Sequence, residues 1–246
     1  MQTAPASPWP DADGVEVLLF DVFGTVVDWH GSIAREMAHA HPQVDGAAFA
    51  RAWRAGYRPA MARVRSGELG WTRIDDLHRM ILDEVLPQFG LAHLDEAARA
   101  HLNRAWHRLD AWPDAVAGVQ RLKTKYICCT LSNGNLGLLT RMAKRAGLPW
   151  DCVLSAEVFH AYKPDPATYL GAAKVFDVAP PRVMLVAAHH DDLAAARACG
   201  LRTAYVERPF EFGRDQPKDV SPVADNDLHS RDLLDLADQL GCPATV

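Results

Sequence analysis

The sequence predicts an α/β protein in which an all-helical block is inserted into a core built on a parallel sheet. Two observations support this fold class. Along most of the chain, short apolar segments typical of buried strands alternate with helical segments, as in successive βαβ units. Residues 30–112 break this alternation, because their pattern is helical throughout and contains no convincing strand. We expect this block to form a cap over the sheet.

The first predicted strand is residues 15–23, a short apolar run rich in β-branched residues. It ends at Gly24 and Thr25, which indicates a buried strand that leads into a turn. Further strands of the same kind are predicted at 126–133, 151–158, 182–188 and 202–208. Open parallel sheets bind ligands at the carboxyl ends of their strands, so the polar residues that follow these segments are candidates for a site.

Helices are predicted between the strands at 136–146, where Gly147 is a stop signal, and at 165–177 and 192–200. Within the inserted block, helical patterns occur at 34–41, 47–65, 73–90 and 94–110. The predicted organisation is a flexible N-terminal arm (1–14), a core (15–29 and 113–246) and a helical cap (30–112).

Composition excludes several classes of function. The 246 residues include 26 basic and 31 acidic side chains with no basic cluster, which argues against nucleic acid as a partner. No apolar run approaches the roughly 18 residues of a membrane span, and the N-terminus lacks the pattern of a signal peptide. The five cysteines include no C-x-x-C pair, so reduced thiols in a cytoplasmic protein are expected.

Two motifs follow the first two long strands. Asp21 ends the first strand, beside Thr25 and turn N–H groups; it is placed for use as a nucleophile, or it simply caps the strand end. Ser132 and Asn133 follow the second, next to Gly134. This loop can bind an oxyanion through a hydroxyl and backbone N–H groups at a helix start, or it is a capping turn.

The third motif contains Lys163, which precedes Pro164 and lies six residues before Tyr169. A residue before proline is biased to an extended backbone. From there the ammonium can aim at the nucleophile and keep that carboxylate ionised. The alternative is a solvated surface lysine.

The fourth motif places His189, His190, Asp191 and Asp192 directly after a very apolar strand. Burying such groups is costly unless they are used or exposed. A metal site is disfavoured here, because adjacent residues do not all point to one centre.

These four motifs, in this order and at these separations, resemble the haloacid dehalogenase superfamily, and most closely its L-2-haloacid dehalogenase (type II) branch. The resemblance extends from about residue 15 to 240 and includes the position of the cap. It implies a Rossmann-like core with an inserted helical cap. It also implies that Asp21 is the nucleophile and that Ser132 and Lys163 match the Ser and Lys of the family.

Within this superfamily, the resemblance favours a dehalogenase over a phosphatase. Phosphatase-like members carry an acid two residues after the nucleophile, where this chain has Phe23. They also place an acid in the fourth motif to hold Mg²⁺, where this chain has Ala188. Mg²⁺ prefers oxygen ligands in an octahedral arrangement, which Asp21 and Asp192 alone supply poorly. Phe23 instead adds an apolar wall that limits solvation of the nucleophile.

The resemblance implies a hydrolase that converts a small 2-haloacid, either a haloacetate or a 2-haloalkanoate, to the 2-hydroxyacid without a metal or other cofactor. Asp21 would attack the halogen-bearing carbon and form an ester, which water then hydrolyses. Asp192 is the candidate to orient or deprotonate this water, together with His189. Ser132 and Asn133 would hold the substrate carboxylate.

The cap is expected to supply the halide site, because the type II family has an Arg there in a Trp-Arg pair. The matching pair is Trp53 and Arg54, and Arg58 lies one helical turn onward as a rival. The alternative is a solvated helix face. Thr25 and Tyr169 complete the predicted substrate site.

This chain departs from the family in the fourth motif, which usually reads Ser-Ser-Asn with a Trp before the acid. The corresponding residues here are Ala187, Ala188, His189 and Asp191. We hypothesise that His189 replaces the Asn in positioning water, and that His190 is structural. Extra donors near the leaving group would favour small substrates and even fluoride, which gains most from hydrogen bonds.

Two other functions stay open at this level: a phosphatase acting on a small phosphate ester, and a non-catalytic binding protein that retains the fold. The expected partners are a small anionic substrate and the halide, with no nucleic acid and no membrane. A homodimer is compatible with the resemblance. The choice of halide, the stereochemistry and the physiological substrate stay open. We assign no chemical role to residues 207–213, which are predicted to form a loop after the last clear strand.

Overall fold

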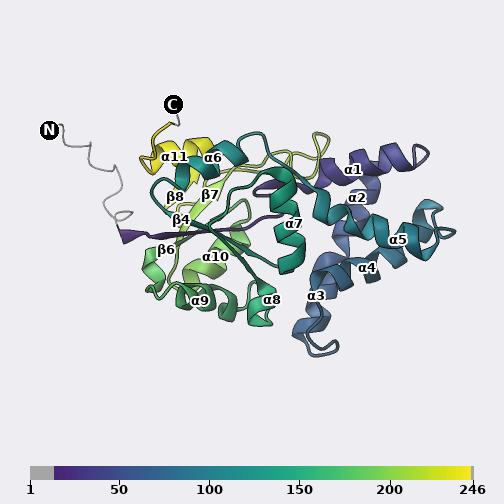
Figure 1. Cartoon of the computed structure of the whole chain (residues 1–246), viewed down its shortest axis with the longest axis horizontal. Helices are drawn as coiled ribbons and strands as arrows, with labels where there is room; N and C mark the ends of the chain where they lie inside the picture. The colour runs from purple at the N-terminus through teal and green to yellow at the C-terminus, as the bar shows by residue number, and fades with distance from the viewer. Residues whose placement is uncertain (1–13, 245–246) are drawn as a thin grey trace.

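The computed structural model of the chain describes residues 14–244, so the arm predicted for 1–14 lies almost wholly outside the described residues. Six parallel strands form one sheet in the order β5-β4-β1-β6-β7-β8. The strands are β1 (Val17–Phe20), β4 (Ile127–Ser132), β5 (Cys152–Ser155), β6 (Val183–Ala187), β7 (Arg202–Val206) and β8 (Leu228–Ser230). The predicted α/β fold with a parallel sheet is confirmed, and Figure 1 shows the sheet on one side and the cap helices on the other.

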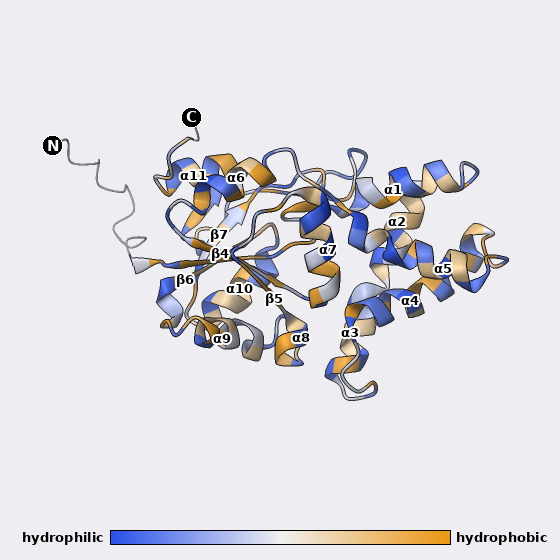
Figure 2. Cartoon of the chain, viewed as in Figure 1, coloured by the Kyte–Doolittle hydropathy of each residue, from blue (hydrophilic) through white to orange (hydrophobic). Residues whose placement is uncertain are grey.

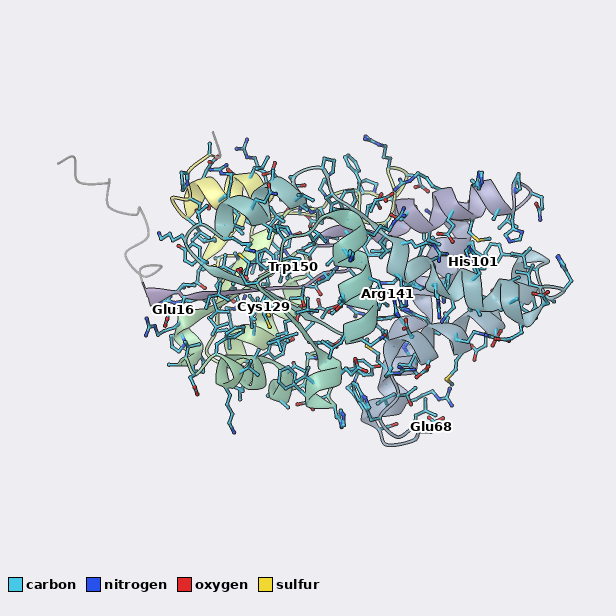
Figure 3. The ribbon with its side chains drawn as sticks, in the orientation of Figure 1. Glu16, Glu68, His101, Cys129, Arg141 and Trp150 are labelled. Carbon is cyan, nitrogen blue, oxygen red and sulfur yellow. The ribbon has the colours of Figure 1, made fainter. Side chains whose placement is uncertain are left out.

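The central strands are buried on both faces. Along β1, Leu18 and Phe20 pack into one hydrophobic cluster, and Val17 and Leu19 pack into another. Successive side chains of a strand point to opposite faces, so a strand covered on both sides becomes a continuous apolar run. Cys129 of β4 lies within this core, fully buried (Figure 3).

Helices cover both faces of the sheet. The cluster that contains Leu18 also takes side chains from α6 (Ala115–Leu122), α7 (Leu136–Ala146) and α11 (Leu233–Gln239). The opposite cluster takes side chains from α9 (Pro166–Val175) and α10 (His190–Ala198). In Figure 1, α6 and α11 lie above the sheet and α9 and α10 lie below it. The short helix α8 (Ala156–Phe159) follows β5.

The sequence located five of the six strands and missed the last. β8 is three residues long and includes His229, so it lacks the long apolar run that marks the others. β1 is shorter than its predicted range of 15–23, because the chain leaves the sheet at Asp21. The end of α7 agrees with the predicted stop: Gly147 has φ 70°, a left-handed backbone that favours glycine.

Residues 29–108 are helical apart from short connections. The elements are α1 (Trp29–Ala40), α2 (Gly46–Ala55), α3 (Tyr57–Arg65), α4 (Ile74–Val85), η2 (Leu86–Phe89), α5 (Glu96–Asn103) and η3 (Arg104–Arg108). Figure 2 shows hydrophilic and hydrophobic residues side by side on α1, α4 and α5, as expected of helices with one buried face.

Two short strands connect this block to the sheet. β2 (Val27–Asp28) pairs antiparallel with β3 (Asp110–Ala111), just before α1 and just after η3. We therefore keep 30–112 as the proposed extent of the cap. None of the helices in residues 14–244 is long and apolar enough to cross a membrane.

The segment predicted as helical at 47–65 is broken at Gly56, between α2 and α3. A Cβ built on Gly56 would lie 2.4 Å from Cγ2 of Ile81 in α4. A side chain at this position would therefore collide with α4. Both short helices contact α4.

Candidate active site

The carboxyl ends of β1, β4 and β6 lie beneath the cap, as the alternation of strands and helices predicts. A cavity of about 630 Å³ separates them from the cap. Core residues Asp21, Asn133, Lys163 and His189 line it from below, and Arg54 lines it from the cap. Side chains distant in sequence therefore meet in one cavity.

Asp21 lies at the base of the cavity, directly after β1. Its backbone N–H donates to the carbonyl of Val186 in β6 (3.0 Å), which fixes the turn. Its Oδ2 accepts a hydrogen bond from the Thr25 hydroxyl (2.7 Å), and its Oδ1 accepts one from Nζ of Lys163 (3.0 Å). The carboxylate is buried and held by both oxygens.

Lys163 joins two carboxylates. Its Nζ donates to Oδ1 of Asp21 and to Oδ2 of Asp192 (2.5 Å). The hydroxyl of Tyr169 donates to the other oxygen of Asp192 (2.5 Å). Thus Tyr169 orients Asp192, and Lys163 connects Asp192 to Asp21.

Burial and the nearest opposite charge shift the pKa values of Asp21, Lys163 and Asp192 in opposite directions. Burial alone would raise the pKa of Asp21, but Lys163, followed by His189, outweighs it and holds that pKa well below its usual range. Burial disfavours the ammonium of Lys163, yet Asp192 and Asp21 raise its pKa above the ordinary value. Burial raises the pKa of Asp192, and Asp21 adds to this against the pull of Lys163. Asp21 is therefore ionised, and Asp192 is the carboxylate more ready to take a proton.

His189 lies between two carboxylates. Nδ1 is 3.0 Å from Oδ2 of Asp21, and Nε2 is 2.9 Å from Oε1 of Glu211. Burial lowers the pKa of His189, but Glu211 and Asp21 together raise it to about 10. At neutral pH the ring is therefore an imidazolium that donates through both nitrogens, and it cannot accept a proton.

Glu211 was missed by the sequence analysis, which assigned no chemistry to residues 207–213. Its side chain is fully buried, and its pKa is lowered to about 2: burial opposes the charge, but His189 and then Lys218 outweigh it. The residue lies 190 positions from Asp21 in a loop without a motif. In the fold, Oε1 of Glu211 lies against Gly24 of the first motif, where a Cβ would come within 2.3 Å of it.

The two rival arginines of the cap differ in the structure. Arg54 lies over the ring of Tyr57 (4.0 Å from Cζ to the ring centroid), and its buried Nη1 has no hydrogen-bond partner among residues 14–244. Arg58 is 79% exposed and pairs with Asp191 (2.7 Å). Both residues line the cavity, and of the two Arg54 is the one with a buried donor that has no hydrogen-bond partner in the described residues.

The remaining predicted substrate residues fall into two groups. Phe23 and Asn133 line the cavity. Phe23 packs edge-on against Trp106 (5.7 Å between centroids), and Oδ1 of Asn133 accepts from the backbone N–H of Lys163 (2.8 Å). Thr25, Ser132 and Tyr169 are fully buried behind the cavity wall. The Ser132 hydroxyl accepts from the N–H of Gly134 (3.1 Å).

In the part of the chain that the structure describes, no group of three His, Cys, Asp or Glu side chains is arranged to hold a metal ion. The ammonium of Lys163 lies between the two carboxylates that a cation would use. Ala188 has no side-chain oxygen to offer a metal; its backbone N–H donates to the Thr25 hydroxyl (2.9 Å) and its carbonyl accepts from Nζ of Lys218. This donor set fits a bound ammonium rather than Mg²⁺.

Comparison with known proteins gives a consistent result. A family model described as haloacid dehalogenase-like hydrolase matches residues 15–200. The chain is 32% identical to (S)-2-haloacid dehalogenase 1 of Pseudomonas sp. (strain CBS-3), over 80% of this chain and 86% of that protein.

Two solved structures are similar over almost the whole chain. The L-2-haloacid dehalogenase PA0810 superposes with a TM-score of 0.88 at 46% identity, covering 92% of this chain and 99% of its own. The defluorinating L-2-haloacid dehalogenase Rha0230 also gives a TM-score of 0.88, at 45% identity. This superposition covers 93% of this chain and 96% of the Rha0230 chain.

Proposed function

We propose, from the premise that the chain belongs to the haloacid dehalogenase-like hydrolases, that it hydrolyses the carbon–halogen bond of a small (S)-2-haloacid to give the 2-hydroxyacid. The observation that carries this proposal is the buried, ionised Asp21, which faces the unpaired guanidinium of Arg54 across the cavity. A nucleophile on one side and a cationic halide acceptor on the other are what a displacement reaction requires.

In the first step, Oδ1 of Asp21 attacks the carbon that bears the halogen. Oδ1 has a single donor, Lys163, whereas Oδ2 is occupied by Thr25 and His189. Oδ1 therefore keeps more of its lone-pair capacity for attack. The carbon–halogen bond breaks as the new C–O bond forms, and the halide leaves towards Arg54.

In the second step, water attacks Cγ of the ester. Asp192 takes the proton of this water, since His189 is already protonated. When the Cγ–Oδ1 bond breaks, Lys163 gives a proton to the departing hydroxyacid oxygen and recovers one from Asp192 (2.5 Å). The new carboxyl group of Asp21 releases its proton to solvent. The sum is one water consumed and one halide, one proton and one hydroxyacid formed.

Ser132 and Asn133 stay our candidates for holding the substrate carboxylate. Asn133 lines the cavity. Ser132 lies behind the cavity wall, where its hydroxyl oxygen accepts a hydrogen bond from the N–H of Gly134. Phe23 keeps the base of the cavity apolar, which favours attack by a poorly solvated carboxylate. Metal independence follows in this proposal from the ammonium of Lys163, which pairs with both carboxylates at the place where a metal cation would bind.

Fluoride belongs among the halides to be tested. The similar protein Rha0230 is described as defluorinating. Fluoride is a poor leaving group and depends on donors at the departing atom. The unpaired Nη1 of Arg54 is such a donor.

We also propose that the protein works in the cytoplasm as a homodimer. All five cysteines are free thiols, as a reducing compartment would keep them. Sedimentation equilibrium tests the assembly; a monomer at micromolar concentration would contradict it. Cell fractionation tests the compartment.

The function is tested by halide release, measured by ion chromatography, from fluoro-, chloro- and bromoacetate and both enantiomers of 2-chloropropionate in the presence of EDTA. We expect release from the (S) enantiomer that persists in EDTA and is lost in the Asp21→Asn variant. No release from any substrate would refute the proposal. Mg²⁺-dependent hydrolysis of phosphate esters would then favour a phosphatase, which Phe23 and Ala188 argue against.

A further inference from the structure

We propose that Glu211 is a positioning residue that holds His189 as a charged donor to Oδ2 of Asp21, so that His189 and Thr25 together bind the oxyanion formed when the aspartyl ester is hydrolysed. The inference rests on the proposed function. It gives a role to residues 207–213, which carry no motif.

The contacts form a continuous chain behind the nucleophile. Oδ2 of Asp21 is 3.0 Å from Nδ1 of His189, and Nε2 of the same ring is 2.9 Å from Oε1 of Glu211. With a carboxylate at each nitrogen, the ring orientation is fixed. Glu211 has no exposed surface, so its charge must be compensated within the protein.

Other groups hold Glu211 in place. Nζ of Lys218 donates to Oε2 (2.7 Å) and to the carbonyl of Ala188 (2.5 Å), the residue before His189. The indole N–H of Trp29 donates to Oε1 (3.3 Å). The carboxylate is thus anchored by Lys218, which is itself tied to the residue after β6, and by Trp29 at the start of α1. Its position is set independently of His189.

The charged groups around His189 are arranged to keep the ring protonated. Asp21 and Glu211 are in direct contact with it. The cations Lys163 and Lys218 lie on the far sides of these carboxylates. The net effect of burial and these charges is a pKa of about 10 for His189, and loss of the Glu211 charge removes the largest stabilising contribution.

The charge matters most in the second step. When water attacks Cγ, the electron pair of the carbonyl moves onto Oδ2, which already has two donors: the Thr25 hydroxyl (2.7 Å) and His189. A donor that is in place before the charge develops stabilises the intermediate without reorganisation. A hydrogen bond from a charged donor is stronger than one from a neutral donor. The pair returns to Cγ when the Cγ–Oδ1 bond breaks.

The test compares Glu211→Gln with Glu207→Gln. The control Glu207 accepts from Nε2 of His229 (2.8 Å), on the same loop but outside the cavity lining. With (S)-2-chloropropionate at pH 9, Glu211→Gln should keep a rapid release of about one halide per site, while steady-state turnover falls about tenfold or more. The ester should accumulate and be visible by intact mass. Glu207→Gln should behave like the wild type.

A second readout does not depend on turnover. We expect histidine-labelled NMR titration to place the pKa of His189 near 10 in the wild type and closer to the ordinary 6.5 in Glu211→Gln. Glu211→Asp, which keeps the charge but shortens the side chain by one methylene, should fall between the two in both readouts. This variant keeps the inference testable if Glu211→Gln does not fold.

The inference would be overturned if Glu211→Gln left the titration of His189 unchanged, or if it left the ratio of initial to steady-state halide release unchanged. It would also be overturned if Glu211→Gln lowered turnover as much in a His189→Asn background as it does in the wild type. In that background Glu211 has no imidazole to act through, so its removal should add nothing. If the wild type releases no halide at all, the proposed function fails, and the NMR titration alone still decides whether Glu211 sets the charge of His189.

Discussion

The donors of Arg54 are only partly satisfied by the protein. The guanidinium lies over the rings of Tyr57 (4.0 Å) and Trp29 (5.6 Å), and Nη1 is buried without a hydrogen-bond partner in the described part of the chain. Leaving such a donor unpaired costs free energy. An anion in the cavity would recover it. Arg58, four residues on, has its partner in Asp191.

We therefore predict that Arg54→Met lowers kcat/KM for 2-chloropropionate by about 10²-fold or more, because it removes the donor to the departing halide. Arg58→Met is the matched control and should change kcat/KM by less than about threefold, since exposed ion pairs contribute little. Steady-state kinetics on both variants measures this. Equal losses in the two variants would mean that the halide site is shared or lies elsewhere.

At the scale of the elements, a break between α2 and α3 separates the two candidate arginines, both of which line the cavity. In one continuous helix, Arg54 and Arg58 would lie on the same face. Because the helix is interrupted at Gly56, Arg54 lies in the last turn of α2 and Arg58 in the first turn of α3. The close approach of Ile81 from α4 is what requires glycine at this turn.

Gly56→Ala should destabilise the protein by about 1–3 kcal/mol, because the added methyl group collides with Ile81 and forces α2 away from α4. It should also raise KM by displacing Arg54. Gly70→Ala is the control: no atom lies within 4 Å of its added Cβ, and we expect a change within about 0.5 kcal/mol. Urea denaturation gives both values; similar stabilities for the two variants would contradict the packing argument.

At the scale of the whole molecule, two buried histidines give stability opposite pH dependences. Burial lowers the pKa of His78 to about 3, so the native state resists a proton that the unfolded chain accepts below pH 6.5. The contribution of His78 to the free energy of unfolding is present above pH 6.5 and is lost as the pH falls. His189, with a pKa raised to about 10, contributes fully below pH 6.5 and loses its contribution as the pH rises through 10.

From these two groups, stability should be greatest near pH 6.5. Between pH 6.5 and 5, His78 should remove about 2 kcal/mol from the free energy of unfolding, at about 1.4 kcal/mol per pH unit. His78→Phe should flatten this acid side, whereas His101→Gln, a change at an exposed histidine of α5, should not. Urea midpoints at several pH values test it; an unchanged acid slope in His78→Phe would rule out His78 as the cause.

Local patterns in the sequence were sufficient to predict the fold class and to place the candidate site at one edge of the sheet. Apolar strands buried on both faces and stop signals such as Gly147 are local features, so the sheet and most helices could be predicted from them. Asp21, Lys163 and Asp192 could be found because each follows a strand, and parallel strands bring their carboxyl ends to one edge. The resemblance of their motifs then gave the reaction.

The other features of the candidate site depend on contacts that form only in the folded chain. Our proposal of Arg54 over Arg58 as the halide ligand rests on which donors the fold leaves unpaired and which it pairs with Asp191. The charge of His189 depends on Glu211 and Asp21, which no local pattern places at its two nitrogens. Protonation and partner choice are set by distance and burial. These quantities exist only once the loop that carries Glu211 has folded against the turn after β1.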